Sequence, residues 1–144
     1  MKISTRGRYA IRLMLDIAEN EDGAYVSLKD IAVRQNLSMK YLEQIVSQLS
    51  KNGMLKSERG PQGGYKLAKK PEDYTIGSIL RLTEGNLAPV SCLNDRENQC
   101  QRCRECATVD FWGGLYKVIS EYIDRYTLAD LMQSEDSGMK DQFV

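Results

Sequence analysis

All four cysteines of this 144-residue chain lie within a window of fifteen residues, at Cys92, Cys100, Cys103 and Cys106. The last three form a C-x2-C-x2-C run, and Cys92 precedes that run by eight residues. Thiolates are the soft ligands that hold zinc or iron–sulfur clusters, and one loop could fold all four around a single site. Because the sequence contains no histidine, a metal site here must be built chiefly from sulfur.

The spacing of these cysteines favours an iron–sulfur cluster over zinc. A C-x2-C-x2-C run is typical of ferredoxin-style ligation, whereas a zinc ribbon needs two separated C-x2-C pairs. Four thiolates serve 2Fe-2S and 4Fe-4S clusters alike, so the ligand count leaves the cluster type open. Two alternatives also stay open, namely a structural zinc ion and thiols that form disulfides on oxidation.

The composition argues against an enzyme and against a membrane protein. Without histidine there is no imidazole general base and no Ser-His or Cys-His dyad, and no motif prompts catalysis by carboxylates or lysines. The longest stretch free of charge, residues 85–94, is ten residues long, against roughly 20 for a membrane span. The amino-terminal segment lacks the pattern of a secretion signal. We expect a soluble cytoplasmic protein, where clustered cysteines are more often metal ligands or redox sensors than disulfides.

The net charge of zero conceals an asymmetry between the two halves of the chain. Residues 1–82 carry 14 Lys+Arg and 9 Asp+Glu, whereas residues 83–144 carry 6 and 11. A basic front half indicates a polyanionic partner, because lysine and arginine near phosphates release counterions on binding.

Three helices are predicted in the front half. Apolar residues recur at helical spacing over 9–18, with Asp16 among the residues on other faces, and this helix should end near Asn20. Ser27 offers an N-cap to a second, short helix, with Asp30 three residues on, and Ser38 caps a third that stops at residues 52–53. Two short helices separated by about three residues form a helix-turn-helix.

A hairpin is predicted to follow the third helix. Residues 54–57 and 65–67 are typical of short strands, and the Gly- and Pro-rich segment between them is polar and carries Arg59. The order helix, helix, helix, hairpin is that of a winged-helix DNA-binding domain. On the third helix the residues outside the apolar stripe can reach bases and phosphates in a major groove; they are Lys40, Tyr41, Glu43, Gln44, Ser47, Gln48 and Lys51.

The chain resembles a known family along almost its entire length. The segments that carry the resemblance are MKISTRGRYA at 1–10, YLEQ at 41–44, RGPQGGY at 59–65 and TLADL at 127–131. They are similar to the bacterial winged-helix repressors that include the iron–sulfur cluster regulator IscR, the nitric-oxide sensor NsrR and the cysteine-metabolism repressor CymR, and most similar to IscR.

The resemblance implies a homodimer that binds a double-stranded DNA operator. It implies DNA contacts in the third helix at Ser38, Lys40, Tyr41, Glu43 and Gln44, and in the wing at Ser57, Arg59 and Pro61. It also implies a long carboxyl-terminal dimerisation helix. Seven residues keep the 3, 4, 7 spacing of a packing stripe, either against a partner or against the chain's own domain; they are Phe111, Leu115, Val118, Ile119, Tyr122, Ile123 and Tyr126. The glycine pair 113–114 should bend this helix or delay its start.

The cysteine segment departs from the pattern of the closest named relatives, whose clusters have three cysteines and a non-cysteine fourth ligand. Val109 stands where the cluster regulator has a ligating histidine, and valine cannot ligate. Arg8 stands near the position from which the nitric-oxide sensor draws an acidic ligand. We favour ligation by all four cysteines over three cysteines with an oxygen ligand such as Glu105 or Asp110.

The sequence thus predicts a mainly α fold with a small β-hairpin. The predicted parts are a winged helix-turn-helix domain over 1–82, a cysteine-bearing cluster loop over 83–109, a dimerisation helix and following segment over 110–134, and a mobile tail over 135–144. The expected function is repression controlled by an iron–sulfur cluster, at genes for cluster assembly or cysteine metabolism. Alternatives are a repressor controlled by a metabolite, a partner protein or thiol oxidation, and a small iron–sulfur electron-transfer or carrier protein.

Overall fold

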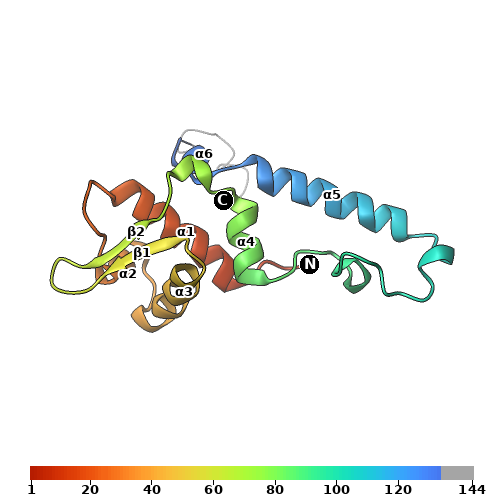
Figure 1. Cartoon of the computed structure of the whole chain (residues 1–144), viewed down its shortest axis with the longest axis horizontal. Coiled ribbons are helices and arrows are strands. Elements are labelled where there is room, and N and C mark those ends of the chain that lie inside the picture. The colour runs from red at the N-terminus through yellow and green to blue at the C-terminus, as the bar shows by residue number, and fades with distance from the viewer. Residues whose placement is uncertain (134–144) are drawn as a thin grey trace.

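A computed structural model describes residues 1–133 of the chain and has two parts, a head and an arm (Figure 1). The tail predicted for 135–144 lies outside the described residues. The head contains α1 (Thr5–Asn20), α2 (Leu28–Gln35), α3 (Met39–Lys51), β1 (Leu55–Glu58), β2 (Gly64–Leu67), the short 3-10 helix η1 (Pro71–Asp73) and α4 (Ile76–Glu84). The arm contains η2 (Ser91–Leu93), η3 (Cys103–Glu105) and α5 (Val109–Arg125), and α6 (Leu128–Gln133) lies back on the head.

The helix starts of the head confirm the caps that the sequence predicted. The Ser27 hydroxyl accepts a hydrogen bond from the Asp30 amide at 3.1 Å, and the Ser38 hydroxyl accepts one from the Tyr41 amide at 3.3 Å. Both caps satisfy amides that have no partner within the helix. Gly53, with a φ of 72°, follows α3 and turns the chain into β1. The two helices of the helix-turn-helix are therefore bounded as expected.

One apolar core joins the three-helix unit, the hairpin and the end of the arm. Leu13, Met14 and Ile17 of α1 are fully buried and lie at the centre of it. Side chains from α2, α3, α4 and α6 complete it, and those with no exposed surface are Ile31, Leu42, Ile45, Leu49, Ile79 and Leu128. Since Leu128 comes after α5, the chain leaves the head, runs out and back through the arm, and is anchored again in the head.

Asp16 corrects the sequence prediction for the first helix. It was expected on an exposed face, but only 2% of it is accessible to solvent. Its carboxylate accepts hydrogen bonds from the Arg34 guanidinium at 2.7 Å and from the Gln35 amide at 2.8 Å. A buried carboxylate is tolerated when it is paired and hydrogen-bonded in this way. Asp16 therefore braces α1 against the end of α2.

The predicted wing is an antiparallel pair of strands with Leu55 opposite Leu67 and Glu58 opposite Gly64. An isolated bridge between Val26 and Tyr65 fastens the hairpin to the segment before α2. Gly64 has a φ of 153° and lies against the Val26 carbonyl, so a side chain at this position would collide with that backbone. The wing is thereby held at a fixed place beside the helix-turn-helix.

The arm is the most extended part of the structure. After α4 the chain runs away from the head through η2 and η3, and α5 returns alongside (Figure 1). The interior glycines Gly113 and Gly114 lie within α5, which begins at Val109, so the alternative that the helix starts after them is wrong. No helix in the described part of the chain is long and apolar enough to span a membrane.

Candidate DNA interface and cysteine loop

The third helix presents a polar stripe to solvent, as the sequence predicted. Lys40, Glu43 and Gln44 are exposed, and Ser47 and Lys51 continue the same side of α3. The opposite side is buried in the core through Leu42, Ile45, Val46 and Leu49. A helix held by one apolar side and open on the other can enter a major groove.

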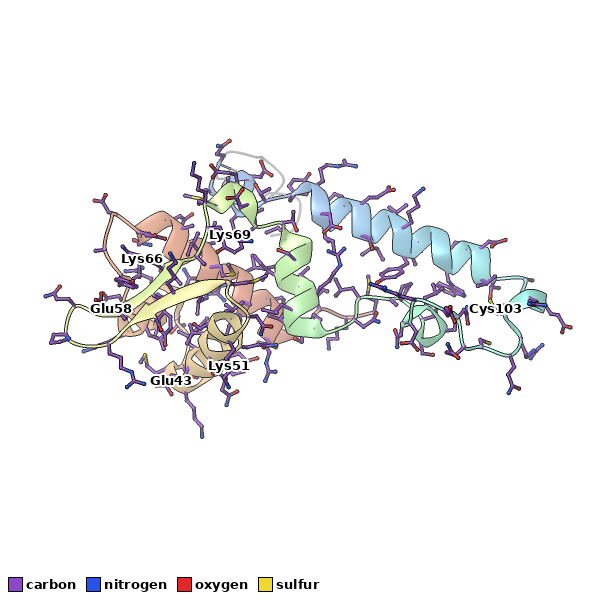
Figure 2. The ribbon with its side chains drawn as sticks, viewed as in Figure 1. Glu43, Lys51, Glu58, Lys66, Lys69 and Cys103 are labelled. Atoms are coloured by element: carbon purple, nitrogen blue, oxygen red, sulfur yellow. The ribbon has the colours of Figure 1, made fainter. Side chains whose placement is uncertain are left out.

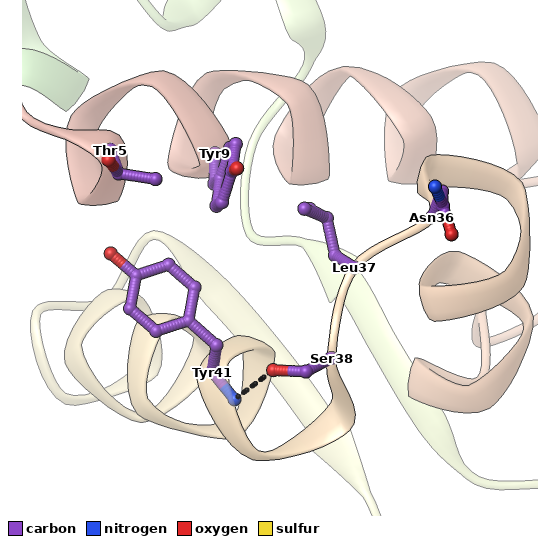
Figure 3. A pocket seen from close by; sticks show the side chains of 6 residues that line it. All are labelled: Thr5, Tyr9, Asn36, Leu37, Ser38 and Tyr41. Carbon is purple, nitrogen blue, oxygen red and sulfur yellow. Dashed lines mark hydrogen bonds between the residues drawn. The ribbon is translucent and has the colours of Figure 1, made fainter.

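Gln48 and Tyr41, at the edges of this stripe, are less available than expected. The Gln48 side chain donates a hydrogen bond to the Leu82 carbonyl at 2.9 Å, so it joins α3 to α4 instead of pointing to solvent. The Tyr41 ring contacts Tyr9 edge-on, with 5.6 Å between ring centroids. Figure 3 shows the Tyr41 hydroxyl directed toward the first turn of α1, where Thr5 lies. Ser38 keeps its exposed position while capping α3.

Of the predicted contact residues of the wing, Arg59 and Pro61 lie in the turn of the hairpin and Ser57 lies on β1, opposite Tyr65. Ser57, Arg59 and Pro61 are all exposed. Gly60, with a φ of 107°, and a hydrogen bond from the Gly63 amide to the Gly60 carbonyl at 3.0 Å define the turn. Within residues 1–133 the Arg59 guanidinium has no hydrogen-bond or ion-pair partner, as suits a group that binds another molecule.

The four cysteines lie on the arm between α4 and α5, away from the head; Figure 2 shows Cys103 near the far end. All four are free thiols, Cys100 exposed and the other three half-buried. The Cys103 amide donates to the Cys100 carbonyl at 3.0 Å, and the Cys106 amide donates to the Cys103 carbonyl at 3.3 Å. These consecutive three-residue turns tend to bring side chains three apart onto one side of the chain.

The donor set fits an iron–sulfur cluster in number and type, but the loop is not closed around one point. Among residues 1–133 no three Cys, Asp or Glu side chains converge closely enough to hold a metal ion. Glu105 and Asp110, the alternative ligands, are exposed, and Val109 is the first residue of α5. Four thiols on one loop match what a cluster requires, and the loop would have to tighten to use them together.

The surroundings of Cys106 make its thiol more acidic. The Thr108 hydroxyl lies 3.4 Å from the Cys106 sulfur and, with the Thr108 amide and the more distant Arg102, lowers the pKa of this thiol below its usual range. A hydrogen bond to sulfur favours the thiolate, which is the form that binds metals and reacts with oxidants.

Two polar contacts that sequence reasoning missed hold α4 to its neighbours, one to α5 of the arm and one to the start of α1 within the head. The Arg81 guanidinium of α4 forms a bidentate ion pair with Asp124 of α5, at 2.6 and 2.7 Å. The Ser4 amide and hydroxyl donate to the Glu84 carboxylate at 3.1 and 2.6 Å, which ties the end of α4 to the start of α1. Both pairs join residues far apart in sequence, so no local pattern could have indicated them. The helix from which the arm departs, α4, is therefore fixed both to α5 and to the start of α1.

The apolar stripe predicted on α5 is largely uncovered by the chain itself. Phe111, Val118 and Tyr122 are 66%, 62% and 55% exposed, and no residue of α5 is fully buried. The alternative that this stripe packs only on its own domain is wrong. A contiguous exposed apolar helix face of this kind is typical of a protein–protein interface.

Comparison with known proteins decides the family. The Rrf2 family, described as iron-dependent transcriptional regulators, matches residues 3–134. The chain belongs to the Rrf2 family of transcriptional regulators. It is 44% identical to the protein Rrf2 of Nitratidesulfovibrio vulgaris, over 92% of this chain and 88% of that protein.

Solved structures of Rrf2-type regulators have the same winged-helix fold. CymR, the global cysteine regulator of B. subtilis, superposes with a TM-score of 0.77 at 37% identity, covering 94% of this chain and 99% of that one. IscR of T. potens superposes with a TM-score of 0.72 at 36% identity, covering 98% and 96%. The predicted mainly α winged-helix fold and the resemblance to this family are confirmed. The chain is a DNA-binding regulator and not an enzyme, and the alternative of an electron-transfer or carrier protein is wrong.

Proposed function

We propose that this Rrf2-family regulator is a homodimeric repressor whose affinity for its operator depends on an iron–sulfur cluster bound by Cys92, Cys100, Cys103 and Cys106. The observation that carries the proposal is the position of all four thiols on the loop that joins the DNA-binding head to the exposed helix α5. When bound, such a cluster supplies a redox-active and oxygen-sensitive cross-link among the ligands.

Dimerisation through α5 is supported by its uncovered apolar side and by its glycines. A Cβ placed on Gly113 or Gly114 would meet nothing within 4 Å in the chain itself. Each interior glycine costs about 1 kcal/mol of helix stability relative to alanine, and within residues 1–133 no close contact at these glycines offsets that cost. A second α5 packed closely against this side would bury the exposed aromatic and aliphatic residues and use the space that the glycines leave.

Transmission from the loop to the reading head is supported by the two attachments to α4. A loop that tightens around its four thiols moves its own ends, and these ends lead into Glu84 and into α5. Glu84 holds the start of α1 through Ser4, and Asp124 holds α5 to Arg81. Loop closure would therefore change how the two heads of a dimer are oriented, and half-sites are read only when the spacing of the reading helices suits the DNA repeat of about 34 Å.

In the head, α3 would contact bases through Lys40, Glu43 and Gln44, with Ser38 and Tyr41 beside them. The Glu43 carboxylate can accept from a cytosine amino group and repels phosphate, and both effects select among sequences. The wing residues Ser57, Arg59 and Pro61 would lie over the adjacent minor groove, where narrow A-T tracts concentrate negative potential that attracts arginine.

The test of cluster binding is an absorption spectrum of protein purified without oxygen, combined with iron and sulfide analysis. The proposal predicts visible charge-transfer bands and stoichiometric sulfide, lost when all four cysteines are replaced by serine. A Glu105→Gln or Asp110→Asn variant should keep the spectrum, because four thiolates suffice. Colourless protein that contains zinc, or no metal at all, would contradict the proposal.

A second candidate keeps DNA binding but replaces the cluster with another signal, either thiol oxidation or a metabolite or partner protein. It is favoured by the separation of the cysteines in this structure and by the likeness to the cysteine regulator CymR. If thiol oxidation is the signal, peroxide treatment of metal-free protein changes operator affinity and a four-serine variant does not respond. If a metabolite or partner protein is the signal, the four-serine variant is regulated as the wild type is.

A further inference from the structure

A groove runs along the side of α3 that faces the start of α1. It consists of three adjoining hollows that share residues, because Thr5 and Tyr41 line the first two and Arg6 lines the second and third. We call it the α1–α3 groove. Figure 3 shows the first of these hollows, between the start of α1 and the segment that leads into α3.

The lining of the α1–α3 groove is rich in donors and free of acidic groups. Its residues are Ser4, Thr5, Arg6, Tyr9, Asn36, Leu37, Ser38, Tyr41, Gln44, Ser47, Gln48, Lys51, Asn52 and Thr83. Hydroxyl and amide side chains dominate, Leu37 is the single aliphatic residue among them, and none is Asp or Glu. The neighbouring Glu84 carboxylate is occupied by two hydrogen bonds from Ser4. A surface of this chemistry is complementary to an anion with many oxygen acceptors.

The two cations of the groove are free to bind such an anion. Within residues 1–133 neither Arg6 nor Lys51 has a hydrogen-bond or ion-pair partner, and both are exposed. Three other arginines of the head are engaged in the fold: Arg12 with Gln35, Arg34 with Asp16 and Arg81 with Asp124. Arg6 and Lys51 therefore lie along the groove without holding the head together.

The groove also lies directly beside the stripe that would read bases. Gln44, Ser47 and Lys51 belong both to the exposed stripe of α3 and to the lining of the groove. With α3 inserted in a major groove, a DNA strand that borders it would pass between this stripe and the start of α1. Half to two-thirds of hydrogen bonds in protein–DNA complexes go to phosphate and sugar, from the kinds of groups found here.

We propose that the α1–α3 groove holds the sugar–phosphate backbone of one DNA strand, with Arg6 and Lys51 as the charged contacts and Thr5, Tyr41 and Ser47 as hydroxyl donors. This inference rests on the proposed function, and adds α1 and the carboxyl-terminal end of α3 to the DNA interface. The contacts fix the register of the reading helix without selecting sequence. Since Ser4 holds the first turn of α1 to Glu84, one wall of the groove is attached to the base of the arm.

The test is a set of salt-dependent binding titrations with Arg6→Ala and Lys51→Ala. The probes are a duplex selected from a random library by the wild-type protein and a shuffled duplex of the same composition. Each phosphate contact contributes a slope of about 0.9 in log affinity against log salt. Losing one or two contacts per dimer should therefore lower the slope by about one to two and weaken binding by about 8- to 60-fold at 0.1 M salt, equally on both duplexes.

Lys69→Ala is the matched control, because Lys69 is also exposed and unpaired; Figure 2 shows it on the side of the head away from Lys51. It should change neither slope nor affinity, and Arg6→Lys should restore most of the slope. If both alanine variants keep the wild-type slope while Arg59→Ala weakens binding to the selected duplex, the groove proposal is overturned and DNA reading by the wing stands. If the wild-type protein selects no duplex, the proposed function itself fails.

Discussion

The ion pair between Arg81 and Asp124 should contribute measurably to stability although it lies at the surface. Its two hydrogen bonds, at 2.6 and 2.7 Å, give the bidentate geometry in which such pairs are strongest. The two side chains are 40% and 43% exposed, so solvent screening keeps the value well below that of a buried pair. We expect a coupling free energy of about 0.5–1 kcal/mol from a double-mutant cycle with Arg81→Gln and Asp124→Asn.

The assay is urea unfolding at one fixed protein concentration, because a dimer's stability depends on concentration. The matched control is the pair Lys117 and Glu121 on the same helix, which is 3.9 Å apart and 76% and 58% exposed. Its cycle should give about 0.3 kcal/mol or less. A coupling at Arg81–Asp124 no larger than this control value would refute the reasoning that the bidentate pair fastens α5 to α4.

The same ion pair predicts a pH dependence of definite sign. The Arg81 guanidinium, through its hydrogen bonds, lowers the pKa of the Asp124 carboxyl below its ordinary value of about 4. The contribution to stability is therefore fully present above pH 4 to 5 and is lost as the pH falls through the lowered pKa. Asp124→Asn should flatten this part of the acid-unfolding curve, and an unchanged curve would contradict the assignment.

Three further predictions concern the DNA interface, the head and the arm. Arg59→Ala should weaken operator binding by roughly 1–3 kcal/mol in gel-shift titrations at fixed salt, because the exposed guanidinium is free to enter a minor groove; unchanged affinity would count against the wing. Asp16→Ala should lower the free energy of unfolding in urea by about 2–4 kcal/mol, since it leaves Arg34 and Gln35 without their buried acceptor; a loss below 1 kcal/mol would contradict this. Val118→Glu, at a position 62% exposed in the protomer, should produce folded monomers in sedimentation experiments; a stable dimer would show that α5 is not the interface.

The parts of the fold that sequence predicted well are those set by local interactions. Ser27 and Ser38 cap their helices by accepting hydrogen bonds from amides three residues away, and Gly53 turns the chain after α3. The residues that determine where these helices begin and end therefore lie within a short stretch of sequence. The wing follows the same logic. The first strand, Leu55–Glu58, begins and ends one residue later than predicted. The second, Gly64–Leu67, begins one residue earlier and ends where predicted.

The failures of prediction all involve partners distant in sequence. Asp16 was expected at the surface because the charge pattern of one helix cannot show that Arg34 will cover it. Gln48 was expected to face DNA, but the carbonyl of Leu82 on another helix takes its side chain.

The candidate site likewise has features that the sequence predicts and features that depend on the fold. Residue type and spacing sufficed to locate the cysteine loop and the exposed polar side of α3, and the individual DNA contacts stay a prediction from the family resemblance. The sequence could not show how the four thiols are arranged, because a loop of short turns between two helices has no periodic pattern. Nor could it show that α4 is held to α5 through Asp124 and to the start of α1 through Glu84.

The central claim is that occupancy of the cysteine loop sets how tightly the dimer holds DNA. The most direct measurement is the affinity of one anaerobic preparation for one selected duplex, before and after its metal is removed by a chelator, at constant salt. The account predicts a change of about 5- to 150-fold, the usual range of coupling between two sites, and no change in the variant with all four cysteines replaced by serine. Equal affinity of the loaded and stripped wild-type protein for every duplex it selects would contradict the account.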